Sequence, residues 1–459
     1  MSPNDSNAQH LVTAVIVAHD GARWLPEVAA ALREQTHPVH RVVAVDTGSR
    51  DRSGVLLTSL FGNGAVFGAD RGTGYGTAIA QALRHRAAHT PVAVGQWRRD
   101  EIVEWVWLLH DDSAPDEEAL EHLLDAASAA RGAAVLGPKV RDWEDRRIII
   151  EAGITIDGAG RRETAAESYE LDQGQHDGER DVLAVSSAGM LIRRDVWDRL
   201  GGFDPSLRLF RDDIDFCWRV IAAGYRVRLV TDAIVYHAEA SARRYRPISV
   251  GGAAGDRPRH LDRRNALYVL LANLPVGPML TALGRNVVGS LLRTLILLVG
   301  KQPGAAWDEV TALASVLSHP LRLLQARRRR GHGRRSAYPV ARSFMPRGKT
   351  VGRITEIVGT ALAGAQPATH TRAGSADEEE ALLTDTGLAQ RIMTSPGVLT
   401  ILGLTIVALV AERSLLRGGW LGGGALVPVR GGASDLWREY LAGCHDVGIG
   451  SAANAPPYV

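Results

Sequence analysis

The eight residues Trp105–Asp112 (WVWLLHDD) decide the fold class, because an apolar run typical of a buried strand ends on two carboxylates. In α/β proteins, ligands bind outside the carboxyl ends of the strands. A second acidic pair, Asp212–Asp213, opens an amphipathic stretch farther along, and His237 closes another apolar run. Two acidic sites and a histidine can supply ligands for a hard cation and a general base. The pattern indicates chemistry on a metal-bound diphosphate.

Short β-branched runs alternate with helical segments from Val12 to about Ala240. The predicted strands are residues 12–18, 41–45, 65–67, 105–109 and 133–136, and the predicted helices are 24–34, 76–88 and 116–130. Alternating units of this size predict a mostly parallel, doubly wound sheet, so the fold class is α/β. The 459 residues exceed one ordinary core, and roughly two to three structural units are expected.

The composition is ordinary, with 45% hydrophobic residues, 23% charged residues and a net charge of +2. Cys217 and Cys444 form neither a disulfide framework nor a metal-ligand pattern, as in a cytosol-facing enzyme. The N-terminus has no basic segment before its first apolar run, so we expect no secretory signal. The catalytic part is therefore expected to lie in the cytoplasm.

Residues 251–335 are expected to form hydrophobic and amphipathic helices at a membrane interface. Ala266–Gly284 carries no charge and is long enough to span a membrane, but its prolines, Asn273 and the following arginines favour a broken, re-entrant or interfacial hairpin. An amphipathic helix is predicted next, with an apolar face formed by Trp307, Val310, Leu313, Leu317, Leu321 and Leu324. It leads into Arg327–Arg330, a cluster better suited to an anionic membrane surface than to nucleic acid, because aromatic residues are not interleaved with it.

The C-terminal part is predicted to cross a membrane once. Residues 336–392 combine a basic segment with a disordered linker, which is rich in Gly, Ala and Thr. Residues 393–413 contain the apolar run Pro396–Val410 and are predicted to be a transmembrane helix. The upstream arginines would keep the N-terminal end of this helix in the cytoplasm. Residues 414–459 would then form an extracytoplasmic tail, which we interpret as the start of a longer membrane region.

Six stretches in order resemble the family 2 inverting glycosyltransferases, which have the GT-A fold. They are AVDTGSRDRS (44–53), RGTGYGTAIAQAL (71–83), LLHDDSAPDEEAL (108–120), SSAGMLIRRDVWDRLGGFDPSL (186–207), FRDDIDFCWRVIAAGYRV (210–227) and VYHAEAS (235–241). The resemblance covers residues 12–265 and implies a Rossmann-like GT-A domain at residues 1–250. A catalytic domain followed by hydrophobic segments resembles the membrane-associated glycosyltransferases of actinobacterial cell-wall biogenesis.

The resemblance implies transfer of a sugar from a nucleotide diphosphate-sugar to a hydroxyl of a lipid-linked or polymeric cell-envelope glycan, with Mg²⁺ or Mn²⁺ as cofactor. The implied partners are the donor, the glycan acceptor and the cell membrane, without nucleic acid. One alternative is a catalytically degenerate glycosyltransferase-fold scaffold, and another is a nucleotidyltransferase, which would need a basic triphosphate loop. The sequence leaves open the donor sugar and its base, the acceptor, the number of membrane passes and the oligomeric state.

By the same resemblance, five residues are expected at the donor. Asp46 would accept hydrogen bonds from the base or ribose, although a turn-forming role is the alternative. His19 would line the nucleotide pocket. Gly74 would let backbone amides face phosphate, or would serve only a glycine-rich turn. Asp111 would lie at the diphosphate, and Arg264 would face the diphosphate or the lipid-linked acceptor, unless it is only a cation beside the membrane.

The resemblance also implies the metal ligands. Asp111 and Asp112 correspond to the Asp-X-Asp region of the family, and His110 replaces the usual first acid. Asp112 would contact the metal and His237 would complete its site, so that Mg²⁺ or Mn²⁺ neutralises the charge that develops on the diphosphate. A helix N-cap is the alternative role for Asp112.

The acidic pair Asp212–Asp213 corresponds to the acceptor-site motif of the family, with Asp213 as the catalytic base. Crowding by Asp212 and Asp215 would raise the pKa of the base toward the working pH. The alternative is an acidic helix N-terminus that compensates the helix dipole.

Overall fold

The computed structural model describes residues 9–92, 102–130, 132–167, 169–243, 245–246, 257–299, 302–331 and 333–345. All of them belong to the first of two compact units, residues 1–381. The predicted linker within 364–389, the transmembrane helix at 393–413, the tail at 414–459 and Cys444 lie outside the described residues.

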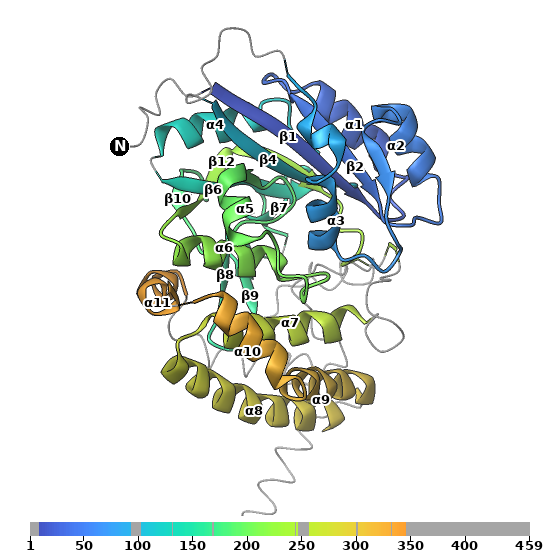
Figure 1. The fold of residues 1–459 in the computed structure, drawn as a ribbon. Coiled ribbons are helices and arrows are strands. Elements are labelled where there is room, and N and C mark those ends of the chain that lie inside the picture. Colours follow the sequence, from blue (N-terminus) through green and yellow to red (C-terminus); the bar gives the residue numbers. More distant parts are fainter. Residues whose placement is uncertain are drawn as a thin grey trace, which may run out of the picture. The chain divides into compact units, whose positions relative to one another are not determined.

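A mixed, mostly parallel sheet forms the centre of the fold (Figure 1). Its long strands are β1 (Gln9–Ala18), β2 (Arg41–Asp46), β4 (Ile102–His110), β6 (Ala133–Asp142) and β12 (Arg226–His237). The shorter strands are β3 (Val66–Gly68), β5 (Ser113–Pro115), β7 (Ile149–Glu151), β10 (Arg180–Asp181) and β11 (Leu191–Arg193). The order is β10-β12-β6-β11-β4-β1-β2-β3, with β11 antiparallel to both of its neighbours. The predicted α/β class with a mostly parallel sheet is confirmed.

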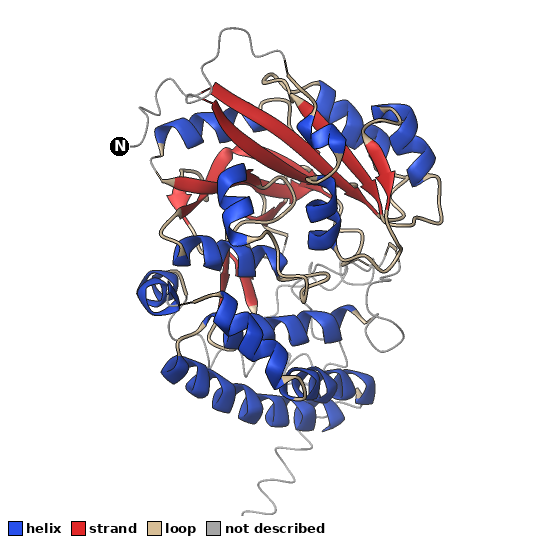
Figure 2. Cartoon of the chain, viewed as in Figure 1, coloured by secondary structure: helices blue, strands red, loops and turns tan. Residues whose placement is uncertain are grey.

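Helices cover both faces of this sheet because alternate strand residues point to opposite sides (Figure 2). Val12 and Ile16 of β1 pack in one core with α1 (Leu25–Arg33), α2 (Ser53–Phe61) and α4 (Ala119–Ala129). Val15 and Val17 pack in the other core. The helices of that core include α3 (Tyr75–Ala82), α5 (Arg194–Leu200) and α6 (Asp212–Ala222). A separate two-stranded sheet consists of β8 (Ile154–Ile156) and β9 (Arg162–Thr164).

Five further helices follow the sheet. They are α7 (Pro258–Asn273), α8 (Val276–Val299), α9 (Pro303–Leu317), α10 (Pro320–Arg329) and α11 (Gly333–Ser343). The predicted break in the first apolar segment is confirmed, because α7 ends before Pro275 and α8 starts after it. The single amphipathic helix predicted over 307–324 is wrong. Two helices form there because Pro320, which has no amide hydrogen, starts a new one.

One helix in the described part of the chain, Val276–Leu298, is long and apolar enough to cross a membrane. Only 22% of its most apolar window is buried. Exposed apolar side chains continue from this helix onto its neighbours: Val276, Leu280, Val288, Leu291, Leu292, Leu295, Leu298, Trp307, Val310, Leu317, Leu321 and Leu324. We call these residues the apolar face.

Arg327–Arg330, at the end of α10, was predicted to be a cluster on a membrane surface, but two of its four side chains are buried. Arg327 is buried and donates to the carbonyl oxygens of Leu271 and Leu274. The Arg330 guanidinium, 4% exposed, pairs with Asp204 at 2.9 Å and with Asp215 of α6 at 2.6 Å. Residues three apart share one face of a helix, so only the intervening Arg328 and Arg329 are exposed. Arg327 and Arg330 therefore hold α10 against the rest of the protein.

We expect Arg330→Met to destabilise the protein by roughly 3 kcal/mol, because it removes one partner of a buried ion pair. The loss should fall at the lower end of the range for such pairs, since Arg219 and Asn273 still contact Asp215. Urea unfolding of the purified chain would measure the change, with exposed Arg329→Met as the matched control. Equal stability of the two variants would contradict a structural role for Arg330.

Candidate active site

The carboxyl ends of the strands bring most of the predicted residues together. Val17 of β1 pairs with His110 of β4, so the residues that follow both strands share one edge of the sheet. Beside them lies a cavity of about 170 Å³. Its walls include seven residues that the sequence singled out: His19, His110, Asp111, Asp112, Asp212, Asp213 and His237.

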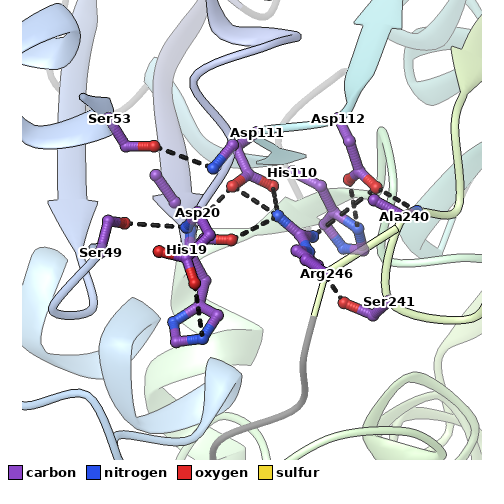
Figure 3. Close-up of polar contacts among 12 residues, drawn as sticks. His19, Asp20, Ser49, Ser53, His110, Asp111, Asp112, Ala240, Ser241 and Arg246 are labelled. Atoms are coloured by element: carbon purple, nitrogen blue, oxygen red, sulfur yellow. Dashed lines mark hydrogen bonds and ion pairs between the residues drawn. The ribbon is translucent and has the colours of Figure 1, made fainter. Parts of the chain in front are cut away.

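Asp111 is held by an arginine from a distant part of the chain (Figure 3). Arg246 Nη1 lies 2.7 Å from both carboxylate oxygens of Asp111 and donates to the carbonyl oxygen of His19, also at 2.7 Å. The His19 amide donates to Asp111 Oδ2 at 2.7 Å. Burial raises the pKa of Asp111 to about 6, and the Arg246 guanidinium opposes that rise. Asp111 is thus already neutralised by a cation of the protein itself.

Asp112 has a different environment on each carboxylate oxygen. Its Oδ2 accepts the Ala240 amide at 2.7 Å and lies 3.6 Å from Arg246 Nη2. Its Oδ1 is buried without a hydrogen-bond partner and faces His237 Nε2 at 3.4 Å and His110 Nδ1 at 3.9 Å. Buried polar atoms are normally paired, so an unpartnered carboxylate oxygen between two imidazoles has the character of a ligand site.

The geometry of these three side chains fits a metal ion. Their ligand atoms all lie within 4.8 Å of one another. Two ligand atoms about 2.1 Å from one ion lie about 3.0 Å apart as cis ligands of an octahedral ion and about 3.4 Å apart in a tetrahedral arrangement. Asp112 Oδ1 and His237 Nε2 have this spacing, at 3.4 Å, whereas His110 Nδ1 lies farther from Asp112 Oδ1, at 3.9 Å. Burial lowers the pKa of His110 to about 3, which keeps its imidazole neutral, as coordination requires. Burial also disfavours ionised Asp112, but Arg246 and His237 hold its pKa well below the usual range.

The acidic pair at the start of α6 occupies another wall of the cavity. Phe210 and Arg211, which precede it, have φ angles of 65° and 68°, an uncommon conformation for side-chain-bearing residues. Asn265 holds this turn by donating to the carbonyl oxygens of Leu209, at 2.7 Å, and Phe210, at 3.1 Å. Tertiary contacts therefore fix the position of the acidic pair.

The two carboxylates of this pair are not equivalent. Burial and the neighbouring Asp213 raise the pKa of Asp212 to about 8, and Asp212 Oδ2 is buried without a hydrogen-bond partner. Asp213 Oδ2 lies 3.4 Å from Nη1 of Arg162, a residue of β9 that also pairs with Glu151. Burial raises the pKa of Asp213 while Arg162 opposes the rise. Burial thus raises the proton affinity of both carboxylates above that of an ordinary aspartate.

Three predicted donor residues do not line this cavity. Asp46 ends β2 and accepts the Ser49 amide at 3.0 Å, in agreement with the turn-forming alternative. Gly74 packs so closely on the Arg208 backbone that a Cβ atom would lie 2.8 Å from Arg208 Cα. Arg264 donates to Asn265 Oδ1 at 3.1 Å and lines a separate pocket with Ser206 and Tyr268.

Sequence reasoning missed several residues that form the walls of the cavity. They are Tyr75, Glu151, Arg162, Ser187, Glu239 and Arg246. A weak local signal existed for Arg246, which ends the basic run ARRYR (242–246) after His237. Arg162 lies on a short strand far in sequence from both acidic motifs, so no spacing pointed to it.

A family match identifies the class of this protein as a glycosyltransferase. The profile described as "Glycosyltransferase like family 2" matches residues 10–247, more than half of the chain, so the protein belongs to glycosyltransferase family 2. It is 25% identical over 240 residues to N-acetylglucosaminyl-diphospho-decaprenol L-rhamnosyltransferase of Mycobacterium tuberculosis. The aligned region covers 50% of this chain and 76% of that protein. It is 23% identical over 229 residues to O-antigen chain rhamnosyltransferase RfbN of Salmonella typhimurium. That alignment covers 49% of this chain and 66% of the relative.

Among solved structures, GalNAc-T7 with UDP, GalNAc and Mn²⁺ matches with a TM-score of 0.40 and 16% identity. The match covers 57% of this chain and 47% of GalNAc-T7, less than half of its length.

Proposed function

We propose that this protein is a metal-dependent inverting glycosyltransferase that moves a sugar from a nucleotide diphosphate-sugar to a hydroxyl of a lipid-linked or polymeric cell-envelope glycan. One observation carries the proposal: His110, Asp112 and His237, whose ligand atoms lie within 4.8 Å of one another, line the same cavity as Asp212 and Asp213. The family and the names of its relatives, which act on a diphospho-decaprenol glycan and an O-antigen chain, support this substrate class.

In the proposed reaction, Asp213 takes the proton of the acceptor hydroxyl. The hydroxyl oxygen forms a bond to C1 of the donor sugar while the bond from C1 to the diphosphate oxygen breaks, and the nucleoside diphosphate leaves with the electron pair. Attack opposite the leaving group inverts C1. A divalent cation at His110, Asp112 and His237 would neutralise charge on the leaving group. Arg246 orients Asp111 and adds a fixed positive charge beside the site.

The decisive experiment measures nucleoside diphosphate release from a panel of UDP-, GDP- and dTDP-sugars, with membrane extract as acceptor and with or without Mn²⁺. The proposal expects release with one donor class, dependent on both acceptor and metal. Nucleotide binding without release on any acceptor would favour the alternative of a degenerate scaffold. Two departures from the family give this alternative weight: His110 stands in place of the usual first acid, and Ala80 stands where the family often has an asparagine.

The apolar face is proposed to lie on the membrane and bring the lipid-linked acceptor near the site. Burying apolar side chains in the headgroup region is favourable, and an amphipathic surface of this kind rests in the plane of the interface. Arg328 and Arg329, exposed on α10, add positive charge for anionic lipids.

A spin label at Leu295→Cys should be more accessible to oxygen than to a water-soluble nickel complex when the full chain is reconstituted in vesicles. The matched control is Val55→Cys on α2, because Leu295 is 61% exposed and Val55 is 66% exposed. Both variants need Cys444→Ser; because the other cysteine, Cys217, is buried, only the introduced thiol is then labelled. Electron paramagnetic resonance measures the two accessibilities, and the same aqueous pattern at both positions would contradict membrane contact.

A further inference from the structure

The cation site contains two imidazoles and one carboxylate. His237 Nε2 lies 3.4 Å from Asp112 Oδ1, and His110 Nδ1 lies 3.9 Å from the same oxygen. A carboxylate in place of the His110 imidazole would add a second negative charge and a second oxygen ligand. The metal ligands that the protein offers are therefore two nitrogen atoms and one oxygen atom, with a single negative charge.

The neighbouring Asp111 does not supply the missing carboxylate. Arg246 Nη1 contacts both of its oxygens at 2.7 Å, and the His19 amide donates to one of them. Figure 3 shows the Arg246 guanidinium between Asp111 and Asp112. A metal ion could bind Asp111 only by displacing the buried Arg246 guanidinium. The protein ligands therefore remain the two imidazole nitrogens and the Asp112 carboxylate.

His110 is also held in an orientation that suits coordination. Its Nε2 lies 3.0 Å from Ser187 Oγ. In the tautomer whose Nε2–H donates to that hydroxyl, the Nδ1 lone pair faces Asp112. The ring packs edge-on against Tyr75, with centroids 4.8 Å apart, and against His237, with centroids 5.1 Å apart. Partners of this kind fix the ring and the tautomer of metal-binding histidines.

From this arrangement we infer that His110 makes the site selective for ions such as Mn²⁺, Co²⁺ or Zn²⁺ over Mg²⁺. Mg²⁺ prefers oxygen ligands, keeps its waters and demands near-octahedral geometry. Imidazole nitrogens favour the first-row transition ions, whose affinity for such sites rises along the series from Mn²⁺. The inference rests on the proposed metal-dependent function. It adds that one residue, His110, determines which metal ion the site prefers.

The test is competition between Mn²⁺ and Mg²⁺ on the purified full chain, with UDP, GDP or dTDP added in separate samples. Electron paramagnetic resonance of free Mn²⁺ reports how much Mg²⁺ displaces half of the bound Mn²⁺. We expect His110→Asp, which restores an oxygen ligand, to lower the Mg²⁺ excess by at least about tenfold. His122→Asp on α4, away from the cavity, is the matched control and should leave the ratio unchanged. An unchanged ratio in folded His110→Asp would overturn the inference.

A second measurement does not depend on how well the variant folds. Bound Mn²⁺ in the wild-type chain should show hyperfine coupling to coordinating imidazole nitrogen. Mn²⁺ that binds without nitrogen coupling, or fails to bind with every nucleotide, would also overturn the inference. Nitrogen-coordinated Mn²⁺ without sugar transfer would instead refute the proposed function alone. Transfer supported equally by Mg²⁺ and Mn²⁺ would refute the selectivity alone.

Discussion

Asp213→Asn is expected to reduce nucleoside diphosphate release by about 10²- to 10⁴-fold, the usual contribution of a positioned general base. The amide keeps the shape of the side chain but cannot take the acceptor proton. Donor binding should persist, because Asp213 lies on the wall formed by α6 while the cation site follows the strands of the sheet. Steady-state release and equilibrium donor binding measure the two effects separately.

The matched control for this substitution is Asp232→Asn, an exposed aspartate on β12 that should keep full activity. Asp212→Asn tests how the pair divides its roles. A smaller loss there than in Asp213→Asn would assign the proton transfer to Asp213. If Asp213→Asn retained near-normal release while Asp212→Asn abolished it, the base would be Asp212, whose Oδ2 is buried without a hydrogen-bond partner.

The pH profile gives an independent test of the base. A carboxylate works as a base only when it is ionised, so activity rises as pH rises through its pKa. Burial raises the pKa of both Asp212, to about 8, and Asp213. The acid limb of the kcat/KM profile should therefore lie well above about 4, the ordinary aspartate pKa. A limb near the ordinary value would argue against this pair as the base.

Asp112→Asn is expected to remove metal-dependent activity by about 10³-fold, because a metal contributes several kcal/mol of charge stabilisation at the leaving group. The amide oxygen is neutral and leaves the two imidazoles as the main ligands. Mn²⁺ affinity should fall together with activity, and the two losses should be compared on one preparation by titration and by release of nucleoside diphosphate.

Asp125→Asn, an exposed substitution on α4, controls for the loss of one negative charge. Added Mn²⁺ should partly restore activity to Asp112→Asn if its defect is weak binding of the ion. Normal Mn²⁺ affinity in this variant would contradict the assignment of Asp112 as a metal ligand, whatever its effect on turnover.

The helices that follow the catalytic domain are tied to the helix that carries the proposed base. Arg330, the residue that follows α10, contacts Asp215, two residues after Asp213 on α6. Asn273 of α7 donates to the same carboxylate at 2.8 Å. A displacement of α7 or α10 would therefore disturb α6 directly.

The sequence alone determined the α/β class and the meeting of His19, Asp111, Asp112 and His237 at one edge of the sheet. Both follow from local rules. Apolar runs such as 105–109 form buried strands, and the residues after parallel strands necessarily share an edge. The positions of Asp112 and His237 were predictable for this reason, because Asp112 follows a strand and His237 ends one. Their role as metal ligands was implied by the family resemblance, and His110 was expected only as the replacement of an acid.

Only the tertiary structure decided which charges pair. Arg246 reaches Asp111 across 135 positions of sequence, and Arg330 reaches Asp215 across 115. Neither pairing has a periodic signal, because an arginine side chain is long and its partner depends on how distant segments pack. The same packing turned half of the predicted membrane-surface arginines inward and kept Asp46, Gly74 and Arg264 off the cavity wall. Strand patterns are local and can be read from sequence, whereas charge pairing is a property of the folded chain.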